Sequence, residues 1–127
     1  MPLRKPIVVG AWRIDSMELW DRDYLDLEVP AHITFDRGRL GSFQFGAVRG
    51  WIDYRLSEVG NTARMDFSWE GFNDSDPSCG RAWAVVIDGR LEGRFHLHNG
   101  DESAFSASRV APKPPGRRSR RPASNER

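Results

Sequence analysis

Apolar and polar residues alternate along most of the chain, which is the pattern of strands that bury one face and expose the other. Met65, Phe67 and Trp69 alternate with polar residues, and a similar alternation occurs at 43–47 and 91–98. Residues 82–87 are instead all apolar, which indicates a strand that is covered on both sides or lies centrally. The pattern predicts a mostly β protein.

Turn residues separate these runs. Asp88-Gly89 and Asn99-Gly100 are strong hairpin sequences, because glycine accepts the positive φ that such turns demand. Residues 73–80 are rich in Asp, Ser, Pro and Gly and are expected to form a loop. The stretch 41–57 is expected to form either two strands or one strand bent at Gly46 or Gly50. The expected strands are 9–14, 31–36, 41–49, 50–57, 63–70, 81–88 and 91–98, with an eighth at 103–110.

Seven or eight short strands joined by hairpins predict a small antiparallel up-and-down barrel within one domain, residues 1–111. A two-sheet sandwich is the alternative. Closure of a barrel removes exposed strand edges, and the interior of an eight-stranded barrel holds either packed side chains or one small ligand.

One segment breaks the strand pattern. Met17, Trp20, Tyr24 and Leu27 recur at helical spacing, which predicts a short helix within 15–28, after the first strand. Asp15 and Glu18 are placed like a capping pair, and Pro30 ends any helix. The dense acids of this segment are interpreted as the wet side of the helix: Asp15, Glu18, Asp21, Asp23, Asp26 and Glu28.

The charge distribution divides the chain of 127 residues. Residues 112–127 hold six Lys and Arg and one acid, and residues 1–111 hold the remaining 13 basic and 17 acidic residues. The tail is rich in proline and lacks large apolar side chains, so we expect it to be disordered. Because the body is acidic, nucleic acid is expected to bind weakly at most, and through the tail.

Other classes of protein are excluded by what the sequence lacks. No apolar run is long enough for a membrane-spanning helix. The single cysteine, Cys79, excludes an internal disulfide framework and a multi-cysteine zinc site. We therefore expect a soluble, cytoplasmic protein.

Several segments carry a family resemblance. GAWRIDSMELWDRDYLDL, GSFQFGAVRGWIDYR, FSWEG, GRAWAVV, GRLEGRFHLHNGD and SAFSA together resemble a family of small bacterial proteins of unassigned function. The resemblance covers most of residues 10–107 and implies no activity.

A second resemblance lies at the start of the chain. Gly10-Ala11-Trp12 resembles the G-x-W first strand of the calycin barrels, which include lipocalins, fatty-acid-binding proteins and avidins. The order of strand and short helix is similar to fatty-acid-binding proteins, which implies a helix that lids the barrel. Those proteins hold a carboxylate with an arginine and a tyrosine, and here Arg109 has no tyrosine near it in the sequence.

Five tryptophans are a high count for a chain of this length. Indoles combine a large apolar surface with one N–H donor, so they could line a cavity for a flat or sugar-like ligand, or they could simply fill the core. Glu70 and Arg81 flank the expected loop 71–80 and would either orient a polar ligand or form an ordinary surface pair. The candidate ligand-binding residues are Trp12, Trp51, Trp69, Trp83, Glu70 and Arg81.

A metal site is a weaker hypothesis. His96, His98 and Glu102 have a spacing that resembles the first metal motif of cupins, and imidazoles with a carboxylate can hold a divalent metal. The glycines and the third histidine of that pattern are missing or out of register, and a solvated polar face is the favoured interpretation of these residues. We assign no metal ligand, no cofactor and no catalytic residue.

The expected function is a non-enzymatic, small-molecule-binding barrel with a tryptophan-lined interior, whose partner is a small hydrophobic or aromatic ligand. The first alternative is a protein-interaction module that binds a protein partner through the acidic helix or the basic tail. The second alternative is a cupin-like, metal-dependent enzyme centred on His96 and His98.

Overall fold

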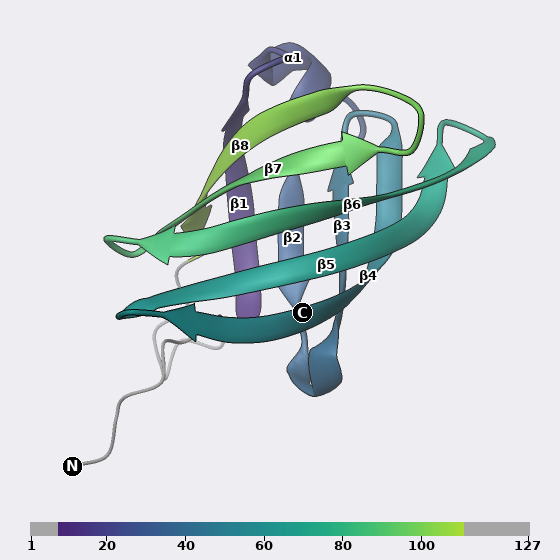
Figure 1. The fold of residues 1–127 in the computed structure, drawn as a ribbon. Helices are drawn as coiled ribbons and strands as arrows, with labels where there is room; N and C mark the ends of the chain where they lie inside the picture. The colour runs from purple at the N-terminus through teal and green to yellow at the C-terminus, as the bar shows by residue number, and fades with distance from the viewer. Residues whose placement is uncertain (1–7, 111–127) are drawn as a thin grey trace, which may run out of the picture.

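The computed structural model describes residues 8–110, which form a closed barrel of eight antiparallel strands (Figure 1). Each strand pairs with its neighbours in sequence, and the last strand pairs with the first. A short helix, α1 (Arg22–Leu25), follows the first strand, and a 3-10 turn, η1 (Arg37–Arg39), follows the second. The strands are β1 (Gly10–Met17), β2 (His32–Phe35), β3 (Leu40–Phe45), β4 (Val48–Val59), β5 (Thr62–Asn73), β6 (Asp76–Ile87), β7 (Arg90–Leu97) and β8 (Glu102–Arg109).

The predicted up-and-down barrel with one short helix is confirmed, and the eighth expected strand is present. The predicted tail at 112–127 lies outside the described residues. The stretch 41–57 forms two strands, because the chain reverses at Gly46 and Ala47.

The prediction of a loop at 73–80 is wrong. β5 continues to Asn73 and β6 begins at Asp76, so only Asp74 and Ser75 form the turn. Asp74 has φ of 60°, a left-handed conformation that aspartate tolerates better than most residues. The polar and proline residues of this segment therefore sit on a long hairpin.

The interior of the barrel is filled by phenylalanine rings. Phe95 on β7 is fully buried, and its ring centroid lies 4.8 Å from that of Phe105 and 4.9 Å from that of Phe43. The rings of Phe45 and Phe67 lie 5.3 Å and 5.9 Å from it. Rings at these separations are in direct contact, so the centre of the barrel is occupied by its own side chains.

Small residues of β6 face these rings. Ala82 pairs with Phe67 and Ala84 pairs with Met65, and all four side chains point inward and are buried. Trp83 alternates with these alanines, points outward and is only partly buried. Of the two interpretations of residues 82–87, a strand covered on both faces is therefore wrong, whereas a central position agrees with the pairing of β6 with both β5 and β7.

Trp12 and Arg109 close the lower end of the barrel, where β1 meets β8. The Arg109 guanidinium lies 4.2 Å from the centroid of the buried Trp12 ring and donates a hydrogen bond to the Val9 carbonyl oxygen at 2.9 Å. The Trp12 indole N–H donates to the Val8 carbonyl oxygen at 3.0 Å. Burial lowers the pKa of Arg109 from its usual value.

Helix α1 covers the opposite end of the barrel (Figure 1). Leu25 is fully buried, and its carbonyl oxygen accepts a hydrogen bond from Gly46 N–H at 2.9 Å. The Tyr24 hydroxyl accepts from Ala47 N–H at 3.2 Å. The Trp20 ring packs on Tyr24 and Phe45, with centroids 5.8 Å and 5.3 Å away. The helix and these rings form a plug that is anchored to the β3–β4 turn.

The helix is shorter than its sequence pattern suggests. Met17 belongs to β1 and Leu27 is 61% exposed, so neither lies on a buried helical face. The N-cap is Asp21, whose Oδ1 accepts from Tyr24 N–H at 3.1 Å, and not Asp15. β1 pairs with β8 as far as Met17. The residues that the sequence assigned to the first turn of the helix therefore belong to the sheet.

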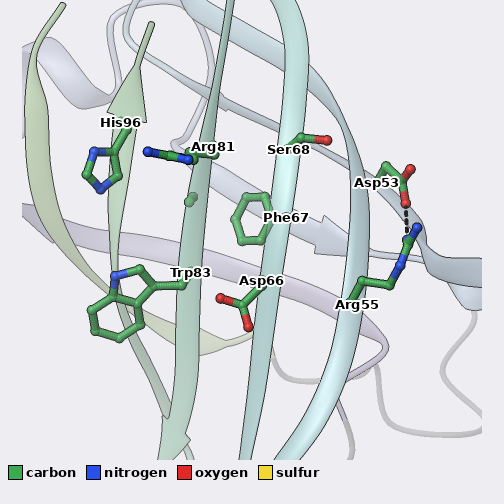
Figure 2. A pocket seen from close by; sticks show the side chains of 9 residues that line it. Asp53, Arg55, Asp66, Phe67, Ser68, Arg81, Trp83 and His96 are labelled. Carbon is green, nitrogen blue, oxygen red and sulfur yellow. Dashed lines mark hydrogen bonds and ion pairs between the residues drawn. The ribbon is translucent and has the colours of Figure 1, made fainter.

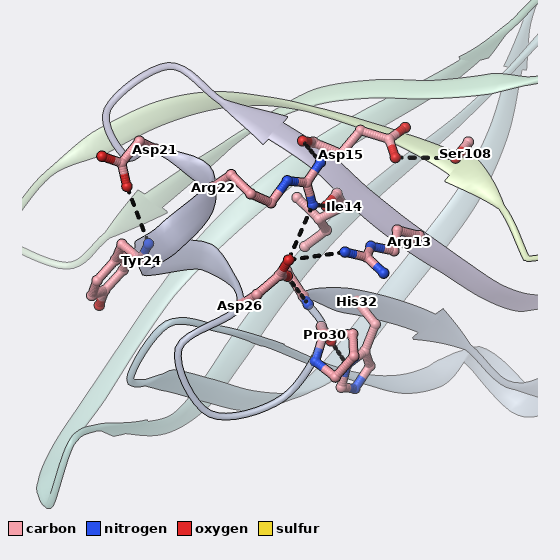
Figure 3. Close-up of polar contacts among 11 residues, drawn as sticks. Arg13, Ile14, Asp15, Asp21, Arg22, Tyr24, Asp26, Pro30, His32 and Ser108 are labelled. Atoms are coloured by element: carbon pink, nitrogen blue, oxygen red, sulfur yellow. Dashed lines mark hydrogen bonds and ion pairs between the residues drawn. The ribbon is translucent and has the colours of Figure 1, made fainter.

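Asp26 fastens the segment that follows the helix (Figure 3). Its carboxylate accepts from Ala31 N–H at 2.9 Å and from Arg13 at 2.9 Å, and Arg22 lies 3.4 Å away. The backbone hydrogen bond from Ala31, together with the charges of Arg13 and Arg22, lowers the pKa of Asp26 below its ordinary value.

The replacement Asp26→Asn is expected to lower the free energy of unfolding by about 1 kcal/mol at neutral pH, because both arginine contacts lose their charge partner. A carboxyl group with a lowered pKa stabilises the fold fully above its ordinary pKa and loses that effect as the pH falls through the lowered value. The difference between wild type and variant should therefore shrink below about pH 4. Urea unfolding at a series of pH values measures it, and a difference that is constant down to acid pH contradicts this assignment.

Candidate functional site

The structure separates the six candidate residues into two groups. Trp12 and Trp69 are buried in the core, with exposed fractions of 2% and 3%. Trp51 is 58% exposed on the outside of β4, and Trp83 is partly buried on the outside of β6. The expectation that these four indoles line the interior is therefore correct for Trp12 and Trp69 and wrong for Trp51 and Trp83.

The reason is the room inside the barrel. Phenylalanine rings from β2, β3, β5, β7 and β8 already meet there. The strand β4 places Ile52 and Tyr54 inward, so Trp51 shares the outward face with Asp53 and Arg55. The indole N–H of Trp69 is buried and has no hydrogen-bond acceptor within the described residues.

Strand register brings the outward candidates together. Trp51 pairs with Glu70 across β4 and β5, and Glu70 pairs with Cys79 across β5 and β6. Two residues further along β5, Ser68 pairs with Arg81. Glu70 and Arg81 are therefore diagonal neighbours on the outer face.

Three adjoining hollows mark this face. One of about 540 Å³ is lined by Ser68, Arg81, Trp83 and His96, among others, and a second of about 550 Å³ shares Ser68, Arg81 and His96 with it. A third, of about 610 Å³, is lined by Trp51, Glu70, Phe72, Pro77 and Cys79 and shares Cys79 with the second. We call these three hollows together the outer groove: the outward-facing residues among 51–55, 66–72, 77–83 and 96–99 of β4 to β7 and the turn after β7.

The outer groove is hollowed at Ser68 because that side chain is small and its neighbours are large. Asp53 flanks Ser68 on β4 and Arg81 flanks it on β6. Figure 2 shows Arg81 and His96 side by side on adjacent strands, with Trp83 and Asp66 further along the same face.

Trp83 is held in a fixed orientation. The Arg64 guanidinium lies 4.8 Å from the centroid of the Trp83 ring. Arg64 is itself fixed by Asp66, to which its Nε and Nη2 donate at 3.0 Å and 2.9 Å. The hydrogen bonds that Arg64 donates to Asp66 raise the pKa of Arg64. One face of the indole is thus covered by a charged group, and this contact holds the ring beside the groove.

Some polar groups of the outer groove have no partner in the described protein. Asp53 and Arg55 pair with each other at 2.8 Å. By contrast, Ser68, Glu70 and Arg81 make no side-chain hydrogen bond or ion pair within residues 8–110. Glu70 and Arg81 therefore do not form the ordinary surface pair considered from the sequence, and both side chains are free to contact a ligand.

The histidines are less organised than the sequence suggests. His96 Nδ1 lies 3.5 Å from Glu102 Oε1, and His98 is exposed beyond the end of β7. Among residues 8–110 no group of three or more His, Cys, Asp or Glu is placed to hold a metal ion. The structure therefore offers no geometric support for the cupin-like alternative.

The acidic segment is bound to the barrel itself. Asp15 pairs with Arg90 at 3.1 Å, and Glu18 lies 3.4 Å from Arg94. Asp26 is held by Arg13, as described above. Three of the six acids are thus ion-paired with the protein's own arginines, which leaves less free negative charge for a protein partner than the sequence suggests.

Sequence reasoning missed Ser68, Asp53 and Phe72 as parts of the outer groove. The alternation around Met65, Phe67 and Trp69 already places Ser68 and Glu70 on one outward face. Phe72 was missed because the expected strand ended at residue 70.

Within the described residues, no helix is long and apolar enough to cross a membrane.

Comparison with known proteins provides no family or function. No family model, no curated protein and no solved structure matches the chain. The resemblances to a small bacterial family and to the calycin barrels therefore remain predictions.

Proposed function

We propose that this protein is a non-enzymatic binding protein that holds a small molecule on the outer groove of its barrel. The observation that supports the proposal is the meeting of two outward indoles, Trp51 and Trp83, with the unpartnered side chains of Ser68, Glu70 and Arg81 on one face. Exposed aromatic residues with free polar groups are the usual composition of a binding surface.

The proposal places the ligand outside because the interior is occupied. Phe95 and the four rings around it leave no space at the centre for a ligand. The barrel is then calycin-like in its strand order and lid, but it binds on a different surface. We place the protein in the cytoplasm, where an exposed thiol such as that of Cys79 stays reduced.

The proposal includes binding and no catalysis. Ser68, Ser78 and Cys79 are the side chains of the outer groove that could act as nucleophiles. None of the three makes a hydrogen bond to a base within residues 8–110. An activated nucleophile requires such a base or a lowered pKa.

Indole N–H signals in two-dimensional NMR spectra test the proposal. Each tryptophan gives one signal, assigned by single Trp→Phe replacements, and the protein is titrated with a library of neutral sugars, nucleosides and flat heteroaromatic compounds. We expect compounds that shift the Trp51 and Trp83 signals and leave those of Trp12 and Trp69 in place. A library in which no compound shifts the outer pair, or in which ligands shift only the Trp12 and Trp69 signals, overturns the proposal.

A further inference from the structure

We propose that the ligand of the outer groove is a neutral carbohydrate chain that lies across both outward indoles. This inference rests on the proposed function and adds the chemical class of the ligand.

The groove is long enough for a chain of sugar rings. Trp51 pairs with Glu70 and Trp83 pairs with Asp66, so the two indoles are offset by four residues of β5 and lie two strands apart. At the usual spacings this is about 13 Å along the strands and about 10 Å across them. A single ring cannot contact both indoles, whereas a chain of rings can.

Trp51 presents an exposed flat apolar surface at one end of the groove, and Trp83 is partly exposed at the other. Trp51 is 58% exposed, and it has neither an aromatic nor a cationic partner within the described residues. Trp83 is fixed by Arg64. The C–H face of a pyranose ring is apolar and flat, so it can stack on an indole while its hydroxyls point sideways.

The polar groups between the indoles suit hydroxyls. Glu70 supplies only acceptors, the guanidinium of Arg81 supplies only donors, and Ser68 supplies both. A sugar hydroxyl donates and accepts at once, so adjacent hydroxyls can use a free carboxylate and a free guanidinium together. A purely aromatic ligand would form a hydrogen bond with neither charged group.

The charge of the groove favours a neutral ligand. Its side chains include three carboxylates, Asp53, Asp66 and Glu70, and two guanidiniums, Arg55 and Arg81. A surface for nucleic acid or for an acidic polysaccharide needs an excess of positive charge, which this face does not have. We therefore exclude an anionic chain.

The test is titration of the full-length protein with neutral oligosaccharides. The panel contains glucose, mannose, galactose, xylose and N-acetylglucosamine polymers in α and β linkage, from monosaccharide to hexasaccharide, with a heparin hexasaccharide and indole as comparison probes. Binding is followed by the indole N–H signals of Trp51 and Trp83 and by calorimetry. We expect at least one neutral series to shift both signals, with an affinity that rises with chain length and changes less than about twofold with salt, because no counterions are released.

Single replacements locate the site. Trp51→Ala and Trp83→Ala are each expected to weaken binding about tenfold or more, and Glu70→Gln and Arg81→Ala to weaken it severalfold. Leu27→Ala is the control, since Leu27 is 61% exposed beside the helix and lies outside the outer groove. Arg81→Ala keeps the test valid if Trp83→Ala unfolds, because Arg81 is exposed and makes no contact that the fold needs.

The outcomes separate this inference from the proposed function. If only indole or other flat compounds shift the Trp51 and Trp83 signals, the outer groove binds ligands but the carbohydrate inference is wrong. If the heparin fragment binds more tightly than every neutral sugar, the inference is also wrong. If no probe shifts the outer indoles, both the inference and the proposed function fail.

Discussion

Replacing Phe95 with alanine is expected to lower the free energy of unfolding by about 3–5 kcal/mol, the cost of removing a fully buried aromatic side chain. Phe95 contacts four other rings at centroid distances of 4.8–5.9 Å, so its loss leaves a cavity at the centre of the barrel. The surrounding rings belong to strands fixed by a closed set of hydrogen bonds, which prevents them from collapsing into the space.

Urea or thermal unfolding followed by circular dichroism measures this effect. Phe72→Ala is the matched control, because Phe72 lies on the outer face, only partly buried against Arg49. We expect the control to cost less than about 1 kcal/mol. Equal losses for the two variants would show that the interior is not tightly packed, and would restore the possibility of a ligand inside the barrel.

The second large effect is expected for Gly93→Ala on β7, at about 3 kcal/mol. An added methyl group would overlap the carbonyl oxygen of Trp83 and would lie 2.8 Å from the Cα of Ala84 and 2.9 Å from the ring of Phe105. Two of these atoms belong to the backbone of β6, so relief requires β6 and β7 to separate. Gly93 thus allows the close approach of two strands where the sheet bends around the core.

Gly100→Ala provides the control of the same type. Gly100 lies in the turn after β7, and a methyl group there would lie 3.3 Å from the nearest atom, the Cβ of Leu97. A change of less than about 1 kcal/mol in either direction is expected, since the stiffer unfolded chain offsets slight crowding. If Gly93→Ala unfolds no more easily than Gly100→Ala, the close approach of β6 and β7 is wrong.

The architecture could be predicted because period-2 alternation survives in nearly every strand. Met65, Phe67 and Trp69 alternate with polar residues in the sequence and face the core in the structure. The strands at 63–70 and 81–88 were expected, but the end of the β5–β6 hairpin was missed because it is built from Asn, Asp, Ser and Pro, residues that mark loops on average. Those residues are tolerated here because this end of the hairpin is exposed to solvent.

The helix was overestimated for a different reason. Helical spacing does connect Met17, Trp20, Tyr24 and Leu27. In the structure, however, Met17 is part of β1 and pairs with β8. Only one turn, Arg22–Leu25, remains helical. Local periodicity cannot report a competing strand partner that lies almost ninety residues away in the chain.

The candidate site was half predicted. Counting tryptophans and noting Glu70 and Arg81 selected four residues that line the outer groove. Assigning the indoles to the interior was wrong for Trp51, because size alone was taken to indicate burial. The alternation of Ile52 and Tyr54 with Trp51 and Asp53 carried the information on direction. For Trp83, the wholly apolar run 82–87 gives no period, so only the register with β5 reveals its direction.

The pairing of β1 with β8 also has a consequence during synthesis on the ribosome. Trp12 pairs with Arg109, so the partners at this seam are 97 positions apart (109 minus 12). The hairpins between β2 and β7 can form as the nascent chain emerges, but β1 keeps one row of backbone groups unpaired until β8 has been translated. Closing so long a loop is slow. Until β8 is available, the free edge of β1 is exposed to other chains. Association with the wrong chain is therefore easiest in the period before the barrel closes.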